Sequence, residues 1–405
     1  MTHEQSANPF RPGNGVLPAY LAGREKPLAE FDAFVADPHP LHANWTVTGL
    51  RGTGKTVLVE TAAARAEAAG WLTLERELGE RHRDDARLAE AIEEDADALL
   101  RRCGLAAALE RSVAHGVRLL RPTKFSVAGL SIEPEPITTR SPADRMRDAL
   151  VRLSDALEDA GRPGALLLYD EAHLLADDRS HERYPLSSLL AALGAVQRTG
   201  EPRVRVVLTG LPTLSLNLKR ARTYAERMFH HIVLANLERG DAWDALTIPL
   251  SRTSRRFATS VVGEIVEATG GYPYHLQFFG AYVWRAAPAA EVTTRAYRSV
   301  EPGLLHELDT SFFEDRFQVA TLAEQAVLLA MARETGAVNL ASIRGHLLGI
   351  PGLAELVSRL IDRGLLYRRG RGTYDFTLPL FRSYLRRQAD ITGITPPVIS
   401  IRGAR

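Results

Sequence analysis

The sequence has almost no cysteine and no long apolar run. Cys103 is the single cysteine among 405 residues, so no disulfide can form within one chain. No apolar run approaches the roughly 20 residues needed to cross a bilayer. Residues 1–20 lack the cationic start and apolar core of a secretory signal. These absences argue against a disulfide-stabilised secreted protein and a membrane-spanning protein, and we expect a cytoplasmic location without membrane contact.

The chain also lacks a strong charge of either sign. Fifty Lys and Arg oppose 49 Asp and Glu, which gives a formal net charge of +1. A nucleic-acid surface would therefore have to be a local patch. The 12 histidines show no metal-ligand spacing, so the sequence predicts no zinc site. A hydrophobic fraction of 45% is ordinary for a globular protein, and the length allows two or three domains.

Short apolar runs alternate with helical segments up to about residue 237. Runs of strand length lie at residues 45–48, 71–74, 165–169, 204–209 and 232–235, and helical segments lie at residues 57–69, 78–118, 143–160 and 189–197. A hairpin is expected at residues 124–134. Strands that alternate with helices predict a parallel α/β sheet, and the chain beyond it is mostly helical.

One motif points to phosphate binding. Residues 49–56 read GLRGTGKT, the G-x-x-x-x-G-K-[ST] pattern of a P-loop, between a β-prone run and an Ala-rich helix. Its glycines let backbone N–H groups converge on a phosphate, which the N-terminus of the next helix also attracts. We expect Lys55 to reach the β- and γ-phosphates of ATP and Thr56 to coordinate Mg²⁺. The expected ATP-binding residues are Gly49, Gly52, Thr53, Gly54, Lys55 and Thr56.

A second motif supplies acids. Residues 166–175 read LLLYDEAHLL, an apolar strand that ends in Asp170 and Glu171. Asp170 at the carboxyl end of the strand is expected to hold Mg²⁺ through water. Glu171 is expected to polarise the attacking water as a general base. The two motifs together predict an Mg²⁺-dependent ATPase.

The quartet DEAH is also known from a class of helicases. Such helicases need two tandem α/β domains, whereas this chain has one P-loop and a helical second half. The quartet therefore indicates a Walker B strand whose next residues are Ala172 and His173. His173 could sense the γ-phosphate or a partner, or it could simply begin a helix.

The motif order resembles that of AAA+ and STAND ATPases. The run Gly23-Arg24-Glu25 before the P-loop looks like the segment that leads into the core of these proteins and helps frame the adenine. The order is similar to that of origin-recognition (replication-initiator) ATPases and archaeal-type ATPases over roughly residues 15–390. This resemblance implies a P-loop NTPase sheet of the AAA+ (ASCE) type, followed by a helical lid and a C-terminal winged helix-turn-helix.

The resemblance and the composition together predict five segments. They are an extended N-terminal arm at residues 1–20, an ATPase core at 21–238, a helical lid at 239–310, a winged helix at 311–390 and a loose tail at 391–405. Pro and Gly are frequent in the arm, and two adjacent prolines lie in the tail.

The resemblance also suggests roles for polar residues outside the two motifs. Thr209 is in the position of a sensor that contacts the γ-phosphate or the lytic water, although it could simply end a strand. Arg227 is in the place of an arginine finger, with Arg220 and Arg222 as rivals, and each could also be a solvated surface arginine. The lid run GGYPYH looks like the GxP motif of STAND switches, which implies that Pro273 contacts the nucleotide, at a place where typical AAA+ proteins have an arginine. This departure favours a switch over a motor, although a proline also suits a helix start.

The C-terminal segment carries a local positive charge. Residues 341–390 contain nine Arg and four acids, a local charge of +5. Arg368, Arg369 and Arg371 lie on the expected wing, where contacts to the phosphates of double-stranded DNA are common. The polar face of the third helix, with Glu355 and Asp362, suits base reading poorly. DNA binding and protein docking both remain open for this segment.

The sequence thus predicts an ATP-hydrolysing switch of the AAA+/STAND type. Its nucleotide state would control engagement of DNA or a partner protein through the C-terminal segment, and it could form a homo-oligomer. Two alternatives remain. One is a DNA-binding ATPase of the replication-initiator type, and the other is a transposition or phage-defence accessory that acts through protein contacts.

Overall fold

The computed structural model describes residues 7–13, 15–103, 140–198, 203–347, 350–370 and 372–392. The hairpin expected at residues 124–134, Arg371 and most of the expected C-terminal tail lie outside the described residues. The chain forms two compact units. The sheet unit contains Lys26–Gly49 and Lys55–Val233, and the helical unit contains Met1–Glu25, Leu50–Gly54 and Leu234–Arg405.

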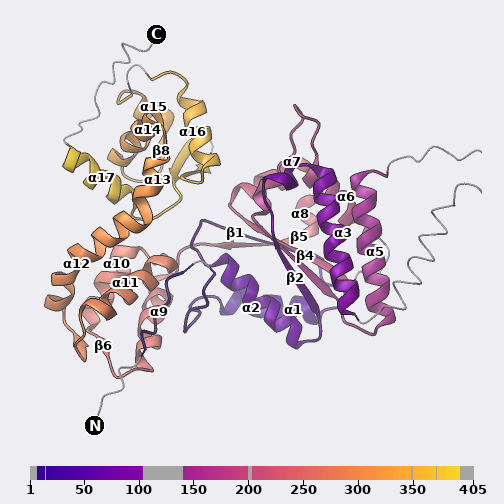
Figure 1. Ribbon diagram of the computed structural model, residues 1–405, viewed down its shortest axis with the longest axis horizontal. Coiled ribbons are helices and arrows are strands. Elements are labelled where there is room, and N and C mark those ends of the chain that lie inside the picture. Colours follow the sequence, from indigo (N-terminus) through magenta and orange to yellow (C-terminus); the bar gives the residue numbers. More distant parts are fainter. Residues whose placement is uncertain are drawn as a thin grey trace, which may run out of the picture. The chain divides into compact units, whose positions relative to one another are not determined.

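A five-stranded sheet is the centre of the sheet unit (Figure 1). Its strands, in the order β2-β3-β4-β1-β5, are β2 (Leu72–Glu77), β3 (Ala165–Asp170), β4 (Val204–Gly210), β1 (Asn44–Gly49) and β5 (Phe229–Leu234). Neighbours from β2 to β1 pair in parallel. The three central strands are almost wholly buried, which explains the apolar run of β3, whereas β1 and β4 also bury polar residues such as Thr46 and Arg205. The prediction of a parallel α/β sheet is confirmed.

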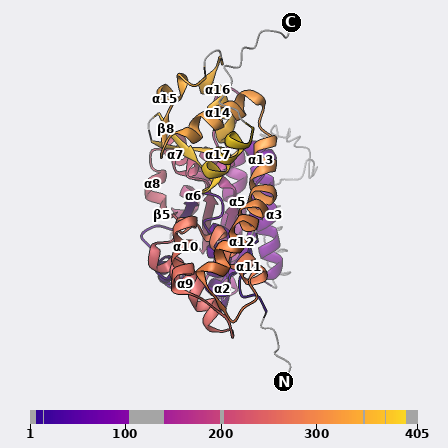
Figure 2. The ribbon, with the colours of Figure 1, turned by 90° about the vertical axis from the view of Figure 1, so that its left-hand side faces the viewer.

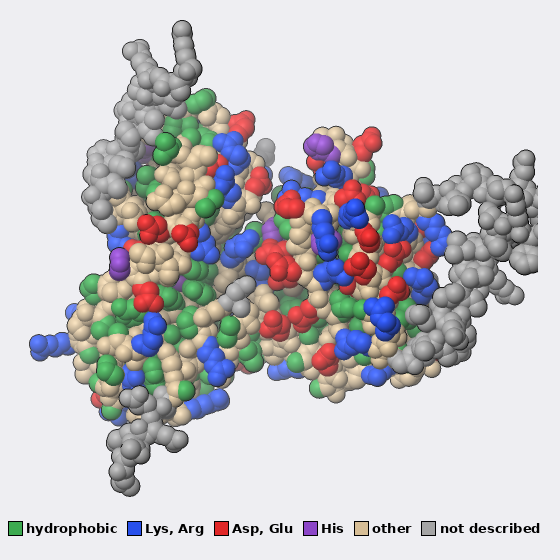
Figure 3. All heavy atoms as spheres, in the orientation of Figure 1, with side chains coloured by type: hydrophobic (Ala, Val, Ile, Leu, Met, Phe, Trp, Pro, Cys, Tyr) green, Lys and Arg blue, Asp and Glu red, His purple; other side chains and the backbone are tan. Residues whose placement is uncertain are grey.

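Helices connect these strands. They are α1 (Glu25–Ala36), α2 (Lys55–Ala68), α3 (Asp85–Arg102), α5 (Pro142–Asp159), α6 (Pro185–Gln197), α7 (Thr213–Ala221) and α8 (Ala225–Met228), with single turns η1 (Glu80–Arg83) and η2 (Ala172–Leu174). Helices α3 and α5 lie side by side (Figure 1). Acidic and basic side chains are interspersed on the face of the sheet unit in Figure 3, as expected of solvated helices.

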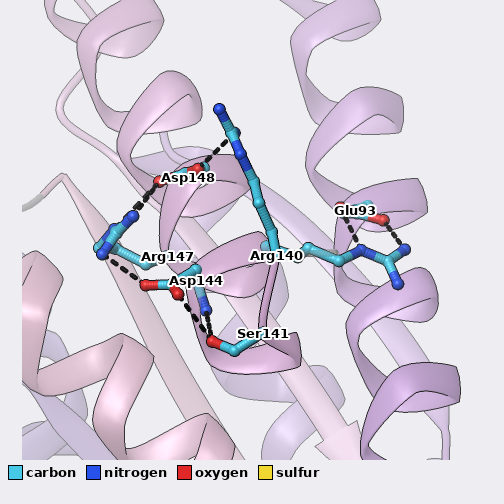
Figure 4. A network of polar contacts seen from close by, with 7 residues as sticks. Glu93, Arg140, Ser141, Asp144, Arg147 and Asp148 are labelled. Carbon is cyan, nitrogen blue, oxygen red and sulfur yellow. Dashed lines mark hydrogen bonds and ion pairs between the residues drawn. The ribbon is translucent and has the colours of Figure 1, made fainter. Parts of the chain in front are cut away.

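The start of α5 is fixed by a polar network (Figure 4). The Ser141 hydroxyl caps the helix by accepting a hydrogen bond from the backbone N–H of Asp144 at 3.2 Å. The Arg145 guanidinium donates to both carboxylate oxygens of Glu93 on α3. Arg147 bonds Asp144 at 2.7 Å within α5. The cap and the bidentate pair together set where α5 begins and how it lies on α3.

The segment expected to be a lid, called the lid below, contains α9 (Arg239–Ser251), α10 (Thr259–Thr269), α11 (Pro273–Ala286) and α12 (Thr294–Leu308) (Figure 2). It also contains a two-stranded sheet of β6 (Arg256–Phe257) and β7 (Glu291–Val292). The described residues of the expected N-terminal arm form no helix or strand. Phe10 nevertheless packs into the lid, where its ring stacks on Phe257 at 6.0 Å and lies against Gly280. Its burial attaches this segment to the lid.

The C-terminal module follows the lid and comprises residues 309–392. Its elements are the π-helical turn η3 (Asp309–Phe313), α13 (Glu314–Gln318), α14 (Leu322–Arg333), β8 (Val338–Asn339), α15 (Leu340–Arg344), α16 (Leu353–Asp362), β9 (Leu366–Gly370), β10 (Thr373–Phe376) and α17 (Phe381–Thr392). Strands β8, β10 and β9 form an antiparallel sheet. The module and the lid share one hydrophobic core. No helix in the described part of the chain is long and apolar enough to cross a membrane.

Candidate nucleotide-binding site

The P-loop connects β1 to α2. Gly52 and Gly54 have φ angles of +74° and +86°, which only glycine adopts readily. The Thr53 hydroxyl donates to the Leu50 carbonyl at 2.9 Å, and Thr53 is almost wholly buried. Helix α2 begins at Lys55, directly after the loop. The backbone therefore has the curl that the motif predicts, and the Thr53 side chain is used within the loop.

Arg24 stabilises the backbone of this loop. Its guanidinium donates to the carbonyl of Thr53 at 2.9 Å and to that of Ala235 at 3.2 Å. The side chain is buried, and this burial lowers the pKa of Arg24. Gly23 has a φ of +63°, and the Asp241 carboxylate fills the space beside it. Arg24 thus fixes the P-loop backbone, while the direct contact of Gly23 and Arg24 with the adenine stays a prediction.

In the sheet unit, the Asp170 carboxylate gathers three groups that the sequence singled out. The Thr56 hydroxyl at the start of α2 donates to Asp170 Oδ2 at 3.2 Å. The Thr209 hydroxyl at the end of β4 donates to Oδ1. The backbone N–H of Glu171 donates to the same oxygen at 2.7 Å. The ends of two neighbouring strands and one helix therefore meet at a single oriented carboxylate.

Thr56 and Asp170 form a donor set that fits Mg²⁺. Both offer hard oxygen atoms, and Mg²⁺ is usually bound by one or two protein oxygens together with substrate phosphates and water. Their mutual hydrogen bond of 3.2 Å brings the hydroxyl and carboxylate close enough to bind one ion. The two residues that the sequence nominates for the metal are thus neighbours in the fold.

Glu171 has an unusual backbone conformation. Its φ is +54° and its ψ is +27°, a left-handed conformation that costs a non-glycine residue roughly 1–3 kcal/mol. Its Oε2 lies 3.0 Å from Nδ1 of His173. Asn217 holds His173 in turn by donating a hydrogen bond to its backbone carbonyl at 2.9 Å. His173 also packs against Gly210, where a Cβ would lie only 3.0 Å from the backbone nitrogen of His173. The structure therefore places His173 beside the expected general base.

The three candidate arginine fingers lie together on the segment of α7 and α8. Arg220, Arg222 and Arg227 are all exposed. No hydrogen bond or ion pair of their side chains is found within the described ranges. An exposed arginine suits both a finger offered to a neighbouring copy and a solvated surface residue, so the choice among the three stays a prediction.

Pro273 is the first residue of α11. Gly270 and Gly271 before it have φ angles of +56° and +71°, and the Gly271 carbonyl accepts a hydrogen bond from the backbone N–H of Leu237 at 2.9 Å. A proline at this position suits a helix start because its fixed φ is helical and no N–H is lost. Its proposed contact with the nucleotide stays a prediction.

Sequence reasoning missed Tyr272, the residue before Pro273. Its hydroxyl donates to the P-loop carbonyl of Arg51 at 2.5 Å, and its side chain is fully buried. The phenol occupies the place that a Cβ on Gly52 would take. Burial raises the pKa of Tyr272, so the phenol stays protonated and donates. The one available signal was Gly52, a glycine at a position where the motif accepts any residue.

Most arginines of the C-terminal module are already engaged. Arg359 pairs with the buried carboxylate of Glu324 at 2.9 Å. The others bind backbone carbonyls or acids: Arg363 binds Val319, Arg382 binds Met331, Glu334 and Asp375, Arg386 binds Ala332, and Arg387 binds Asp309. On β9, Arg368 and Arg369 are exposed, and Arg369 lies 3.6 Å from Asp375. The local charge of +5 therefore overstates the basic surface that is available.

Comparisons with known proteins agree with this geometry. Residues 20–207 match a family model described as an AAA ATPase domain, and residues 310–385 match a domain of unknown function (DUF8462). No curated protein matches the chain. The fold is similar to that of the Walker-type ATPase PABY2304 of Pyrococcus abyssi, at 18% identity over 93% of this chain and 98% of that chain, with a TM-score of 0.52.

A second solved structure is the ORC2 protein of Aeropyrum pernix in ADPNP–ADP complexes. It is 14% identical over 94% of this chain and 98% of that chain, with a TM-score of 0.51. At such low identity, these likenesses establish the fold alone. The chain thus has the fold of P-loop ATPases, and the match of residues 20–207 to an AAA ATPase domain confirms the resemblance for this part of the chain.

Proposed function

We propose that this protein is an Mg²⁺-dependent ATPase that works as a nucleotide-controlled switch. The observation that supports this most is the Asp170 carboxylate, which accepts hydrogen bonds from the Thr56 and Thr209 hydroxyls in the sheet unit. A structural acid at a strand end would need neither the P-loop threonine nor a threonine from the next strand. This arrangement is expected where a carboxylate orients a metal and its ligands.

Each polar residue then has a role in the reaction. Backbone N–H groups of the P-loop and Lys55 bind the phosphates of ATP. Thr56 and Asp170 hold Mg²⁺, which would neutralise charge on the β- and γ-phosphates. Glu171 orients and polarises the water that attacks the γ-phosphate, and Thr209 contacts that phosphate or the water. Arg227 of a neighbouring copy is the first candidate for the arginine finger, which would make the active assembly a homo-oligomer.

The switch acts through a difference in affinity between ATP-bound and ADP-bound conformations. To move a two-state equilibrium from 1:99 to 99:1, ATP must favour one state by about 5.5 kcal/mol. Contacts of Thr209 and Arg227 with the γ-phosphate would supply this preference, because ADP lacks that group. Pro273 stands where a sensor arginine is common in such ATPases, so the lid lacks the γ-phosphate contact that this arginine would make. The lack of this contact favours slow switching over continuous cycling.

The output of the switch is the C-terminal module, which we propose to be a winged helix that docks a protein partner. The engaged arginines support this choice, because Arg359 on the third helix is half exposed but donates its Nε–H to buried Glu324, which leaves only its other N–H groups for a base. DNA is the second candidate, favoured by exposed Arg368 and Arg369 on the wing. Binding to a protein partner would indicate an accessory ATPase of the cytoplasm, whereas binding to DNA would indicate an ATPase of the replication-initiator type.

ATP turnover by the full chain separates these outputs. We would measure it with and without random duplex DNA at two salt concentrations. Slow turnover that DNA leaves unchanged supports the protein-docking switch, and turnover that DNA stimulates and salt suppresses supports the DNA-binding candidate. Lys55→Ala should lose ATP binding, whereas Glu171→Gln should bind ATP and hydrolyse it poorly. Equal hydrolysis by Glu171→Gln and the wild type would refute the proposed reaction.

A further inference from the structure

Tyr272 makes a contact that the chemistry of ATP hydrolysis does not require. Its phenol lies inside the helical unit, is fully buried and donates to the P-loop carbonyl of Arg51 at 2.5 Å. Gly52 can have no side chain here, because a Cβ would overlap the phenol. Tyr272 is held in turn by the tight turn at Gly270–Gly271, where a Cβ on Gly271 would overlap the Leu237 carbonyl. Both partners in this contact are therefore fixed.

The Tyr272 ring begins a chain of aromatic contacts that reaches the C-terminal module. It meets His275 edge-on at 4.5 Å between ring centroids, and His275 meets Phe313 at 6.0 Å. Phe313 then contacts Phe381 and Tyr384 of α17, each at 5.5 Å. All five side chains are at most 1% exposed. Each ring in this aromatic chain therefore packs on the next without intervening solvent.

His275 is costly at this place. Neither ring nitrogen has a hydrogen-bond partner among the residues that the structure describes, although the side chain is fully buried. A leucine or phenylalanine would pack there without that penalty. The stability of the core therefore does not explain why a histidine is present at this position.

The lid joins the C-terminal module through one turn of π-helix, η3. This turn carries Phe313, and its first residue, Asp309, is bound by Arg387 of α17. Single π-helical turns are rare and often occur at functional sites, because they interrupt the regular helical hydrogen bonds. The joint between lid and module is therefore irregular in its backbone and fixed to α17 by both a ring contact and an ion pair.

We propose that Tyr272 is a positioning residue for the P-loop, and that the aromatic chain transmits the conformation of the loop to α17. The proposal rests on the proposed function, since it needs ATP at the P-loop. When phosphate draws the loop N–H groups together, the Arg51–Gly52 peptide turns and its carbonyl moves. The buried phenol has no free space, so it passes the movement to His275 and Phe313 rather than absorbing it.

The first test removes only the hydroxyl of Tyr272. Tyr272→Phe should weaken the binding of both ATP and ADP about 10-fold, the size expected for the loss of one hydrogen bond. Tyr297→Phe is the matched control, because Tyr297 is a fully buried lid tyrosine whose hydroxyl donates to Glu301 at 3.3 Å instead. It should leave nucleotide affinity unchanged. Equal affinities of Tyr272→Phe and the wild type would overturn the positioning role.

The second test follows amide hydrogen exchange in α17 with and without ATP. ATP should change exchange in α17 of the wild type. Phe313→Leu and His275→Leu should bind ATP within about 3-fold of the wild type but lose this change, because they break the ring contacts. Phe279→Leu, at a buried lid residue outside the aromatic chain, should keep it. An intact response in both chain variants would overturn the transmission, whereas a wild type that binds no ATP would refute the proposed function itself.

Discussion

The buried, unpartnered His275 makes the stability of the helical unit depend on pH. Burial lowers the pKa of His275 to about 3, whereas an unfolded histidine titrates near 6.5. Between these values the unfolded chain binds a proton that the folded chain does not. The contribution of neutral His275 to the free energy of unfolding is therefore fully present above about pH 6.5 and is lost as the pH falls toward 3. In the described part of the chain, the rings of Tyr272, Tyr274, Phe312 and Phe313 face His275, and none of these side chains carries a carboxylate.

The size of this loss follows from the two pKa values. A pH of 5 is about 1.5 units below the pKa of the unfolded histidine, and each unit corresponds to about 1.4 kcal/mol of unfolding free energy. His275 alone should therefore cost about 2 kcal/mol between pH 7.5 and pH 5. His275→Phe keeps the ring contacts and removes the proton, so it should abolish that part of the loss.

Urea unfolding at pH 7.5 and pH 5 measures this effect as a difference between two proteins. The other histidines contribute equally to the wild type and to His275→Phe, so subtraction isolates His275. His306→Phe, at an exposed position on α12, is the control and should behave as the wild type does. If the wild type and His275→Phe lose stability in parallel, His275 is not buried as a neutral ring and the reasoning fails.

Three further predictions concern the phosphate site and the C-terminal module. Thr209→Val should lower kcat at least 10-fold with ATP affinity within about 3-fold, in steady-state kinetics, because the lost hydroxyl orients Asp170. Gly52→Ala should weaken ATP binding at least 10-fold by calorimetry, since its φ of +74° is strained for alanine and a Cβ overlaps Tyr272. Glu324→Ala should destabilise the module by about 2–4 kcal/mol in thermal unfolding, because it removes both a helix cap and the partner of Arg359.

Local patterns were sufficient to predict the sheet and the core of the site. The P-loop and the D-E strand are contiguous motifs, and the parallel sheet was indicated by apolar runs between helices. The resemblance predicted Thr209 only as a sensor of the γ-phosphate. Its hydrogen bond to Asp170 follows from the parallel pairing of β3 with β4, which brings their carboxyl ends to one edge of the sheet. The expected third helix of the C-terminal segment is α16, where Leu356, Val357 and Leu360 are buried.

Long-range contacts could not be predicted in the same way. The Tyr272 hydroxyl binds a carbonyl 221 residues away, and nothing in the local pattern of GGYPYH distinguishes it from a core tyrosine. The left-handed backbone of Glu171 depends on packing of η2 against β4, which is also nonlocal. The positive charge of the module was misleading because composition cannot tell whether an arginine faces solvent or binds a helix end.

The central claim, that nucleotide state changes the conformation of the protein, is tested most directly by solution X-ray scattering of Glu171→Gln. This variant should hold ATP without hydrolysing it, so its ATP and ADP complexes can be compared at equilibrium with light scattering to fix their oligomer sizes. The account predicts different scattering profiles or oligomer sizes for the two complexes. Identical profiles and identical sizes, with both nucleotides bound, would contradict it.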